Sequence, residues 1–151
     1  MGKKLTKTSS ASRVVYHVTP TRNRSIILRE GLKICAKKRY QQSCDAVYVF
    51  AGLKIAIYYA EGEARDFEEN FDIWKIKAGG KTIKADPMMQ GYNGSLMVID
   101  DIEPERMSLL KIISRRTTEQ AHWKAELDAD DEILPRWAEE IIKASKKACK
   151  K

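Results

Sequence analysis

The sequence has few of the residues that carry metal and disulfide chemistry. It contains three cysteines, an odd number with no CxxC pair, and two histidines among 151 residues. Structural zinc sites and disulfide frameworks need several such residues at short, regular spacings. We therefore expect reduced thiols, no metal site and a cytoplasmic protein.

Long apolar runs are also missing. No stretch approaches the ~20 residues that a helix needs to cross a bilayer. The first residues, MGKKLTKTSSAS, lack the apolar core of a signal peptide. We expect no membrane partner. With 43% hydrophobic and 32% charged residues, the chain has the composition of a globular protein with one core.

Acidic residues are scarce in the N-terminal quarter. Residues 1–39 hold eleven Lys and Arg against one acid, Glu30, in a chain of formal net charge +7. Such a segment favours an anionic partner, either nucleic acid or a phosphate-bearing small molecule. A merely solubilising surface would give the same pattern. Residues 1–12 have no periodicity and are predicted to form a flexible basic arm.

Hydrophobic patterns predict one α+β domain. Alternating or continuous apolar runs predict strands at residues 13–19, 46–50, 73–78, 82–85, 95–99 and 107–113. The run at 95–99 is continuously apolar after Ser95, as in a strand buried on both faces. Residues 35–45 are polar and basic and predict a loop.

Three helical regions are predicted between and after these strands. The first spans residues 22–30, capped by Thr21 or Asn23 and closed by Gly31 in the left-handed region. The second carries one apolar stripe formed by Leu53, Ala56, Ile57, Ala60, Ala64 and Phe67.

The third helical region runs from Thr117 to the end of the chain. A capping box of Thr117 and Gln120 is expected at its start. The last helix is expected to carry a stripe formed by Ile133, Trp137, Ile141, Ala144 and Ala148.

The first strand offers the main candidate for chemistry. His17 and Thr19 are two residues apart, so both side chains emerge on one face. A strand histidine is often structural, with its imidazole bonded to a backbone carbonyl. The helix that follows and Tyr48 on the next strand favour a functional role instead. The other histidine, His122, has no metal-ligand partner at a suitable spacing and is expected to be structural.

Two segments resemble the ADP-ribosyltransferase superfamily. The first is Tyr16-His17-Val18-Thr19-Pro20, continued by Ile26-Ile27-Leu28 and Glu30-Gly31-Leu32. The second is Val47-Tyr48-Val49-Phe50-Ala51 and a helix that contains Tyr58-Tyr59-Ala60. Residues 73–80, Asn93-Gly94 with the strand to Ile99, and Pro104-Glu105 resemble the catalytic lobe of the RNA 2′-phosphotransferase branch.

The resemblance implies a division of the chain and a fold. It covers residues 13–113 and implies a split β-sheet core with flanking helices, as in the catalytic domains of PARP-like proteins. Residues 114–151 lie outside it and are expected to form a C-terminal helical extension packed on the same domain.

The resemblance also implies a ligand, NAD, which would be a substrate, and a site. His17 and Thr19 would face the nicotinamide-side ribose, Tyr48 with Tyr58 or Tyr59 would pack on nicotinamide, and positioning of the ring would favour its departure. Arg22 and Arg24 would balance the pyrophosphate. The implied catalytic residues are His17, Tyr48 and Ser95. Ser95 stands where many members carry a catalytic glutamate, and Val18 replaces a glycine.

Three functions remain open from the sequence. A mono-ADP-ribosyltransferase would modify a protein, a nucleic acid or a phosphate acceptor. A catalytically degenerate member would bind nucleic acid or a phosphorylated ligand through its basic face. A protein–protein adaptor would use the C-terminal helix around Trp137. The missing acid at Ser95 makes chain-extending activity improbable.

Overall fold

The computed structural model describes residues 13–34, 46–86 and 94–149. The arm predicted at residues 1–12, the loop predicted at 35–45 and residues 87–93 lie outside these ranges. The described residues contain a six-stranded antiparallel sheet in the order β4-β5-β2-β1-β3-β6. Its strands are β1 Val14–Pro20, β2 Val47–Phe50, β3 Phe71–Lys77, β4 Ile83–Ala85, β5 Ser95–Val98 and β6 Met107–Ile113.

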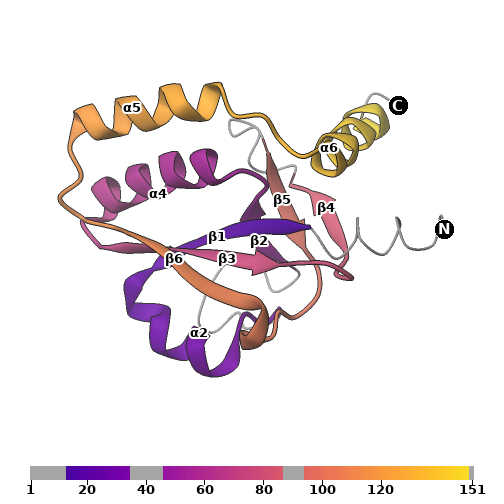
Figure 1. Cartoon of the computed structure of the whole chain (residues 1–151), viewed down its shortest axis with the longest axis horizontal. Coiled ribbons are helices and arrows are strands. Elements are labelled where there is room, and N and C mark those ends of the chain that lie inside the picture. The colour runs from indigo at the N-terminus through magenta and orange to yellow at the C-terminus, as the bar shows by residue number, and fades with distance from the viewer. Residues whose placement is uncertain (1–12, 35–45, 87–93, 150–151) are drawn as a thin grey trace.

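Helices cover both faces of this sheet (Figure 1). Helix α4 (Leu53–Phe67) lies on one face with α5 (Glu119–Asp130) outside it, and α2 (Arg24–Glu30) lies on the other face. Helix α6 (Arg136–Cys149) lies near the end of the sheet that β4 and β5 form. Two 3₁₀ turns, η1 (Thr21–Asn23) and η2 (Pro104–Arg106), complete the described elements. The α+β prediction is confirmed. No helix in the described ranges is long and apolar enough to span a membrane.

The sheet consists of two halves that meet between β1 and β2. Pairing of β1 with β3 runs from Val14–Lys77 to Pro20–Phe71, whereas β1 and β2 are paired at Tyr16–Phe50. On the far side of that contact, β2 pairs with β5 along its whole length. The β1–β2 contact is thus the shortest ladder in the sheet.

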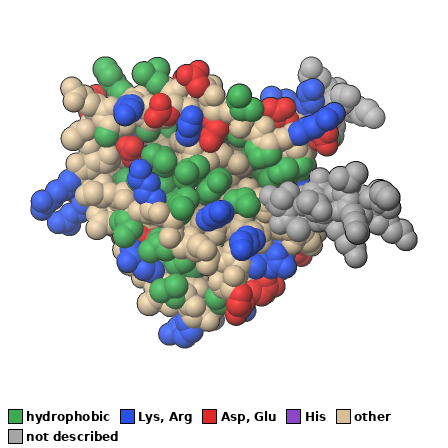
Figure 2. All heavy atoms as spheres, in the orientation of Figure 1, with side chains coloured by type: hydrophobic (Ala, Val, Ile, Leu, Met, Phe, Trp, Pro, Cys, Tyr) green, Lys and Arg blue, Asp and Glu red, His purple; other side chains and the backbone are tan. Residues whose placement is uncertain are grey.

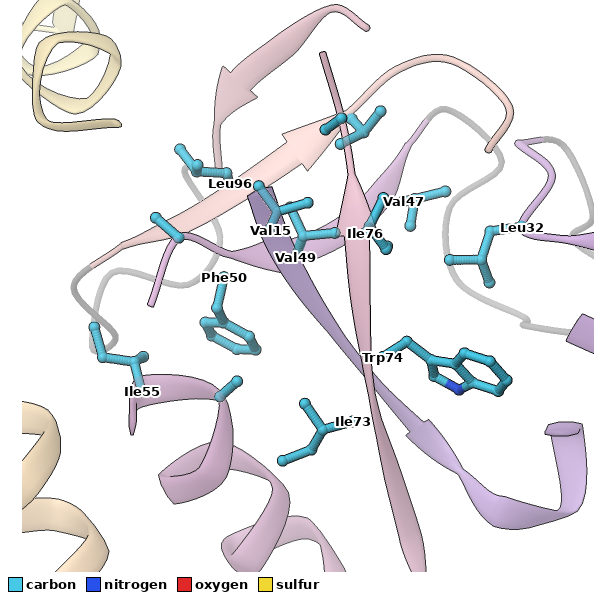
Figure 3. Close-up of a cluster of buried hydrophobic side chains, with 14 of the residues drawn as sticks. Val15, Leu32, Val47, Val49, Phe50, Ile55, Ile73, Trp74, Ile76 and Leu96 are labelled. Carbon is cyan, nitrogen blue, oxygen red and sulfur yellow. The ribbon is translucent and has the colours of Figure 1, made fainter. Parts of the chain in front are cut away.

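Buried side chains pack on both faces (Figure 3). Phe50, Ile55 and Ile73 lie on the α4 side, whereas Trp74 and Leu32 lie on the side that α2 covers. Paired residues of adjacent strands share a face, and successive residues of one strand alternate. His17 is paired with Trp74, so the His17 side chain belongs to the α2 face.

The helix predicted at residues 22–30 begins differently from the prediction. A 3₁₀ turn comes first, and neither Thr21 nor Asn23 caps the helix with its side chain. The Asn23 amide donates to Thr19 (3.0 Å) and the Thr21 hydroxyl donates to Asp72 (2.7 Å), because the adjacent strands offer acceptors. Gly31 has φ +72° and ψ −154°, so its φ is positive but its backbone is outside the left-handed helical region.

The stripe predicted on α4 is largely confirmed. Ala56, Ala60 and Ala64 are fully buried, but Phe67 at the last turn is 62% exposed. Helix α4 also buries Ile55 and Glu61. It packs against the sheet and α5, so its buried surface is wider than one stripe.

The strand predicted at 107–113 forms as β6, but it is an edge strand. Leu109, Leu110 and Ile112 are 37%, 45% and 50% exposed. A β-bulge interrupts the pairing with β3, where Ile73 pairs with Lys111 and Trp74 with Leu109. Bulges twist an edge strand and hinder pairing with another chain.

The C-terminal region is two helices separated by residues 131–135. Thr118, rather than Thr117, caps α5 by accepting from the Ala121 amide (3.0 Å). Pro135 restricts the preceding residue to extended conformations, so Ile133 lies before the last helix and is 91% exposed. The expected stripe from Ile133 onward was therefore wrong at its first position. Leu134 and Ala138 belong to the buried core.

Candidate functional site

The imidazole of His17 has a defined tautomer. Its Nδ1 lies 2.8 Å from the backbone carbonyl oxygen of Tyr48. A carbonyl can only accept a hydrogen bond, so Nδ1 carries the hydrogen and donates. Burial lowers the pKa of His17, and the bond to Tyr48 opposes this shift to a lesser degree. The ring is therefore neutral at pH 7, and Nε2 has a lone pair that can accept from a hydroxyl.

This bond joins the two halves of the sheet. Tyr16 pairs with Phe50, and one residue further along β1 the His17 side chain reaches the backbone of β2. His17 thus makes the bond to a backbone carbonyl that is expected of a structural histidine on a strand. The same bond also fixes the ring orientation, which is what a ligand-binding histidine requires.

A buried carboxylate anchors the segment that follows β1. Asp72 is fully buried on β3. Arg24 donates to both of its oxygens, from Nε to Oδ2 at 2.8 Å and from Nη2 to Oδ1 at 2.7 Å. The Thr21 hydroxyl adds a third bond. These bonds fix the start of α2 against the sheet on the His17 face.

The two arginines expected to bind pyrophosphate both have carboxylate partners. Arg24 is held by the buried Asp72, and this contact raises the pKa of the guanidinium. Arg22 pairs with Glu69, with 64% of the Arg22 side chain exposed. An exposed pair exchanges partners at little cost. Arg22 is thus the more available of the two for an anionic ligand.

Thr19 lies on the His17 face but below the surface. It is 3% exposed, and its hydroxyl oxygen accepts from the Asn23 amide at 3.0 Å. The Thr19 side chain therefore offers almost no accessible surface to a ligand that touches His17. In this structure Thr19 therefore has a local structural partner.

The predicted tyrosines do not converge on His17. Alternation along β2 assigns the Tyr48 side chain to the same face as Phe50, so Tyr48 offers His17 its carbonyl and not its ring. The Tyr59 ring contacts Phe50 (centroids 5.0 Å apart), and the Tyr58 ring stacks on His122 of α5 (4.9 Å). All three rings belong to the α4 side, and the sheet separates them from His17.

Ser95 is also on the α4 side, because it pairs with Phe50. It is 6% exposed, and its hydroxyl has no hydrogen-bond partner among the described residues. The preceding glycine, Gly94, has φ +88° and lies against Leu134 and Ile55. The predicted catalytic set of His17, Tyr48 and Ser95 is therefore divided between the two faces of the sheet.

The sequence analysis did not single out two acidic residues that anchor the starts of helices α2 and α4. Asp72 had a signal, because it is a lone acid inside the apolar run of β3. Glu132 had no such signal in the sequence, because its partners are distant along the chain. Its carboxylate accepts hydrogen bonds from the backbone amides of Lys54 (3.1 Å) and Ile55 (3.0 Å) at the start of α4. A side-chain atom on Gly52 would overlap the Glu132 carboxylate.

The sequence matches no protein-family model and no curated protein with which it was compared. Within the described ranges, no group of three or more His, Cys, Asp and Glu side chains is arranged to hold a metal ion. The assignment of a function therefore depends on the residues described above.

Proposed function

We propose that this chain is an NAD-dependent mono-ADP-ribosyltransferase-like protein, whose acceptor is a protein, a nucleic acid or a phosphate group. The observation that carries the proposal is the His17 imidazole, held neutral with Nδ1 bonded to Tyr48 and Nε2 left as an acceptor. The segment around it resembles the one that faces the nicotinamide-side ribose in the ADP-ribosyltransferase superfamily.

A ribose hydroxyl matches this acceptor. The hydroxyl donates to Nε2 and fixes the sugar beside the junction of β1 and β2, which we propose as the counterpart of the split in the resembled fold. In the reaction, the bond between ribose and nicotinamide breaks and nicotinamide leaves with the electron pair. The acceptor group then bonds to the sugar carbon and loses a proton. His17 contributes by orienting the ribose.

The charged residues add to the ligand site in different ways. Arg22 exchanges Glu69 for the pyrophosphate, since its side chain is largely exposed. Arg24 remains on Asp72 and positions the turn that carries Arg22. Ser95 supplies no carboxylate, which favours single transfer over chain extension.

The test measures NAD binding and nicotinamide release in parallel. NAD at millimolar concentration should raise the melting temperature of the wild type and release nicotinamide slowly. His17→Ala should remove both effects, whereas His122→Ala, which removes the other histidine, should retain them. Absence of any NAD effect on the wild type would refute the proposal.

The second candidate is a non-catalytic module that binds nucleic acid or a phosphorylated ligand. Two observations favour it: Ser95 in place of an acid, and the exposed guanidinium of Arg22. Binding would weaken with salt and with Arg22→Glu, but would survive His17→Ala. Arg24→Glu is a poor test because it also removes the partner of buried Asp72.

A further inference from the structure

A cavity of about 230 Å³ lies between α4, α5 and β6. Ile57 of α4 and two alanines of α5, Ala121 and Ala125, form its apolar wall. The small alanine side chains leave a hollow between the two helices. Helix α4 covers one face of the sheet, whereas His17 pairs with Trp74 and belongs to the other face. This cavity is therefore separate from the proposed NAD site.

Three lysines from three different elements line the cavity. They are Lys54 of α4, Lys111 of β6 and Lys124 of α5. Each is exposed, and none forms an ion pair with any residue that the structure describes. Ammonium groups gathered at one concavity repel each other and raise the local concentration of anions.

Two acids also line the cavity, the exposed Asp128 of α5 and the buried Glu61 of α4, so the lysines exceed the acids there by one. Glu61 is 7% exposed, and its Oε2 accepts from the Thr117 hydroxyl at 3.3 Å. Burial raises the pKa of Glu61, and the hydrogen bond from Thr117, followed by the nearby His122 and Lys111, opposes this shift. A carboxyl group at this position accepts hydrogen bonds from ligand hydroxyls, as Thr117 already illustrates. An anion without hydroxyl groups would gain no hydrogen bond from this carboxylate.

Together these groups define a ligand with two chemically different ends. We infer that the cavity binds a small phosphorylated sugar, with the phosphate on Lys111 and Lys124 and a sugar hydroxyl on Glu61. The sugar carbons pack on Ile57 and the alanines. Helix α5, EQAHWKAELDAD, has one lysine against four acids, so its surface offers no continuous basic stripe for a nucleic acid strand. Figure 2 shows acidic and basic side chains mixed on the face it displays.

The experiment titrates ribose 5-phosphate, ribose and inorganic phosphate into the full chain by calorimetry. Ribose 5-phosphate should bind more tightly than either fragment. The double variant Lys111→Gln/Lys124→Gln should weaken it about tenfold or more, because each charge-assisted bond is strong. Lys143→Gln, which removes an exposed lysine of α6, is the matched control and should bind as the wild type does.

A second variant tests the sugar end. Glu61→Gln should weaken ribose 5-phosphate several-fold and leave inorganic phosphate unchanged or tighter, since a negative charge is removed. The inference is overturned if the wild type binds no ribose 5-phosphate at millimolar concentration, or if Lys143→Gln weakens binding as much as the double variant.

The remaining outcome separates this site from the proposed function. Loss of ribose 5-phosphate binding in His17→Ala would assign the ligand to the His17 face and overturn the inference. Retained binding in His17→Ala, with nicotinamide release lost, would support both proposals. Binding of ribose 5-phosphate without any NAD effect on the wild type would support the cavity alone.

Discussion

Arg24 and Asp72 form two parallel hydrogen bonds, and the Asp72 side chain is fully buried whereas that of Arg24 is 31% exposed. This asymmetry decides what each substitution does. Removing the arginine leaves a carboxylate in the protein interior with one remaining hydroxyl donor, Thr21. Removing the aspartate leaves a guanidinium that can still reach water.

Arg24→Met should therefore destabilise the fold strongly. We expect a loss of about 3–5 kcal/mol in the free energy of unfolding, the range for an uncompensated buried charge. Urea denaturation monitored by tryptophan fluorescence gives this value. Arg29→Met is the control, because Arg29 pairs with Glu30 at the surface, and such pairs are worth ~0–1 kcal/mol. Equal effects of the two variants would show that the Asp72 contact contributes no more than a surface pair.

His17 should make stability depend on pH below its ordinary pKa. Burial lowers the pKa of the folded-state imidazole from 6.5, so the unfolded chain binds the proton more readily. The stabilisation from neutral His17 is complete above about pH 6.5 and declines as the pH falls, by at most ~1.4 kcal/mol per pH unit. Urea denaturation at pH 7.5 and 5.5 measures the decline. It should be smaller in His17→Gln than in the wild type and in His122→Gln.

Gly31 and Gly80 should respond differently to the same substitution. Both have positive φ, +72° and +81°. A side chain on Gly31 would overlap the backbone carbonyl of Ile102, whereas none of the described atoms lies within 4 Å of the corresponding position on Gly80. Gly80→Ala should cost about 1–2 kcal/mol for the backbone conformation alone.

Gly31→Ala should cost more than Gly80→Ala, because the Leu32–Ile102 bridge must shift as well. Thermal denaturation of both variants compares them. A melting temperature for Gly31→Ala equal to that of Gly80→Ala would show that this contact relaxes freely.

Local patterns predicted most elements of the described chain. The alternation in β1 and β3 and the alanine spacing of α4 are local signals, and all three elements formed close to where they were expected. Some errors had local causes, such as Pro135 before the last helix. Others came from contacts distant in sequence, such as the bond from Thr21 to Asp72. Phe67 fits the stripe but lies at the exposed last turn of its helix.

The candidate site was harder to predict because it depends on which face of the sheet each side chain occupies. Strand periodicity places His17 and Thr19 together, but it cannot relate β1 to β2. The Tyr16–Phe50 register decided that the Tyr48 ring is on the opposite face from His17. A one-residue shift in that register would have reversed the result.

Glu132 and Gly52 should act as one unit at the start of α4. Glu132 accepts from the amides of Lys54 and Ile55, which otherwise lack helical partners. Glu132→Ala should therefore cost about 1 kcal/mol, the typical value of a helix cap. Gly52→Ala should cost a similar amount, since φ −125° suits alanine but its methyl group displaces the carboxylate.

Because both changes remove the same two hydrogen bonds, the double variant should be little less stable than either single variant. A double-mutant cycle by urea denaturation gives the coupling energy, expected at about 1 kcal/mol. Glu140→Ala replaces Glu132→Ala in the control cycle, since Glu140 is exposed on α6 and pairs with Arg136. Its effect should add to that of Gly52→Ala. Additive effects of Glu132→Ala and Gly52→Ala would mean that Gly52 is required for a reason other than the space that the Glu132 carboxylate occupies.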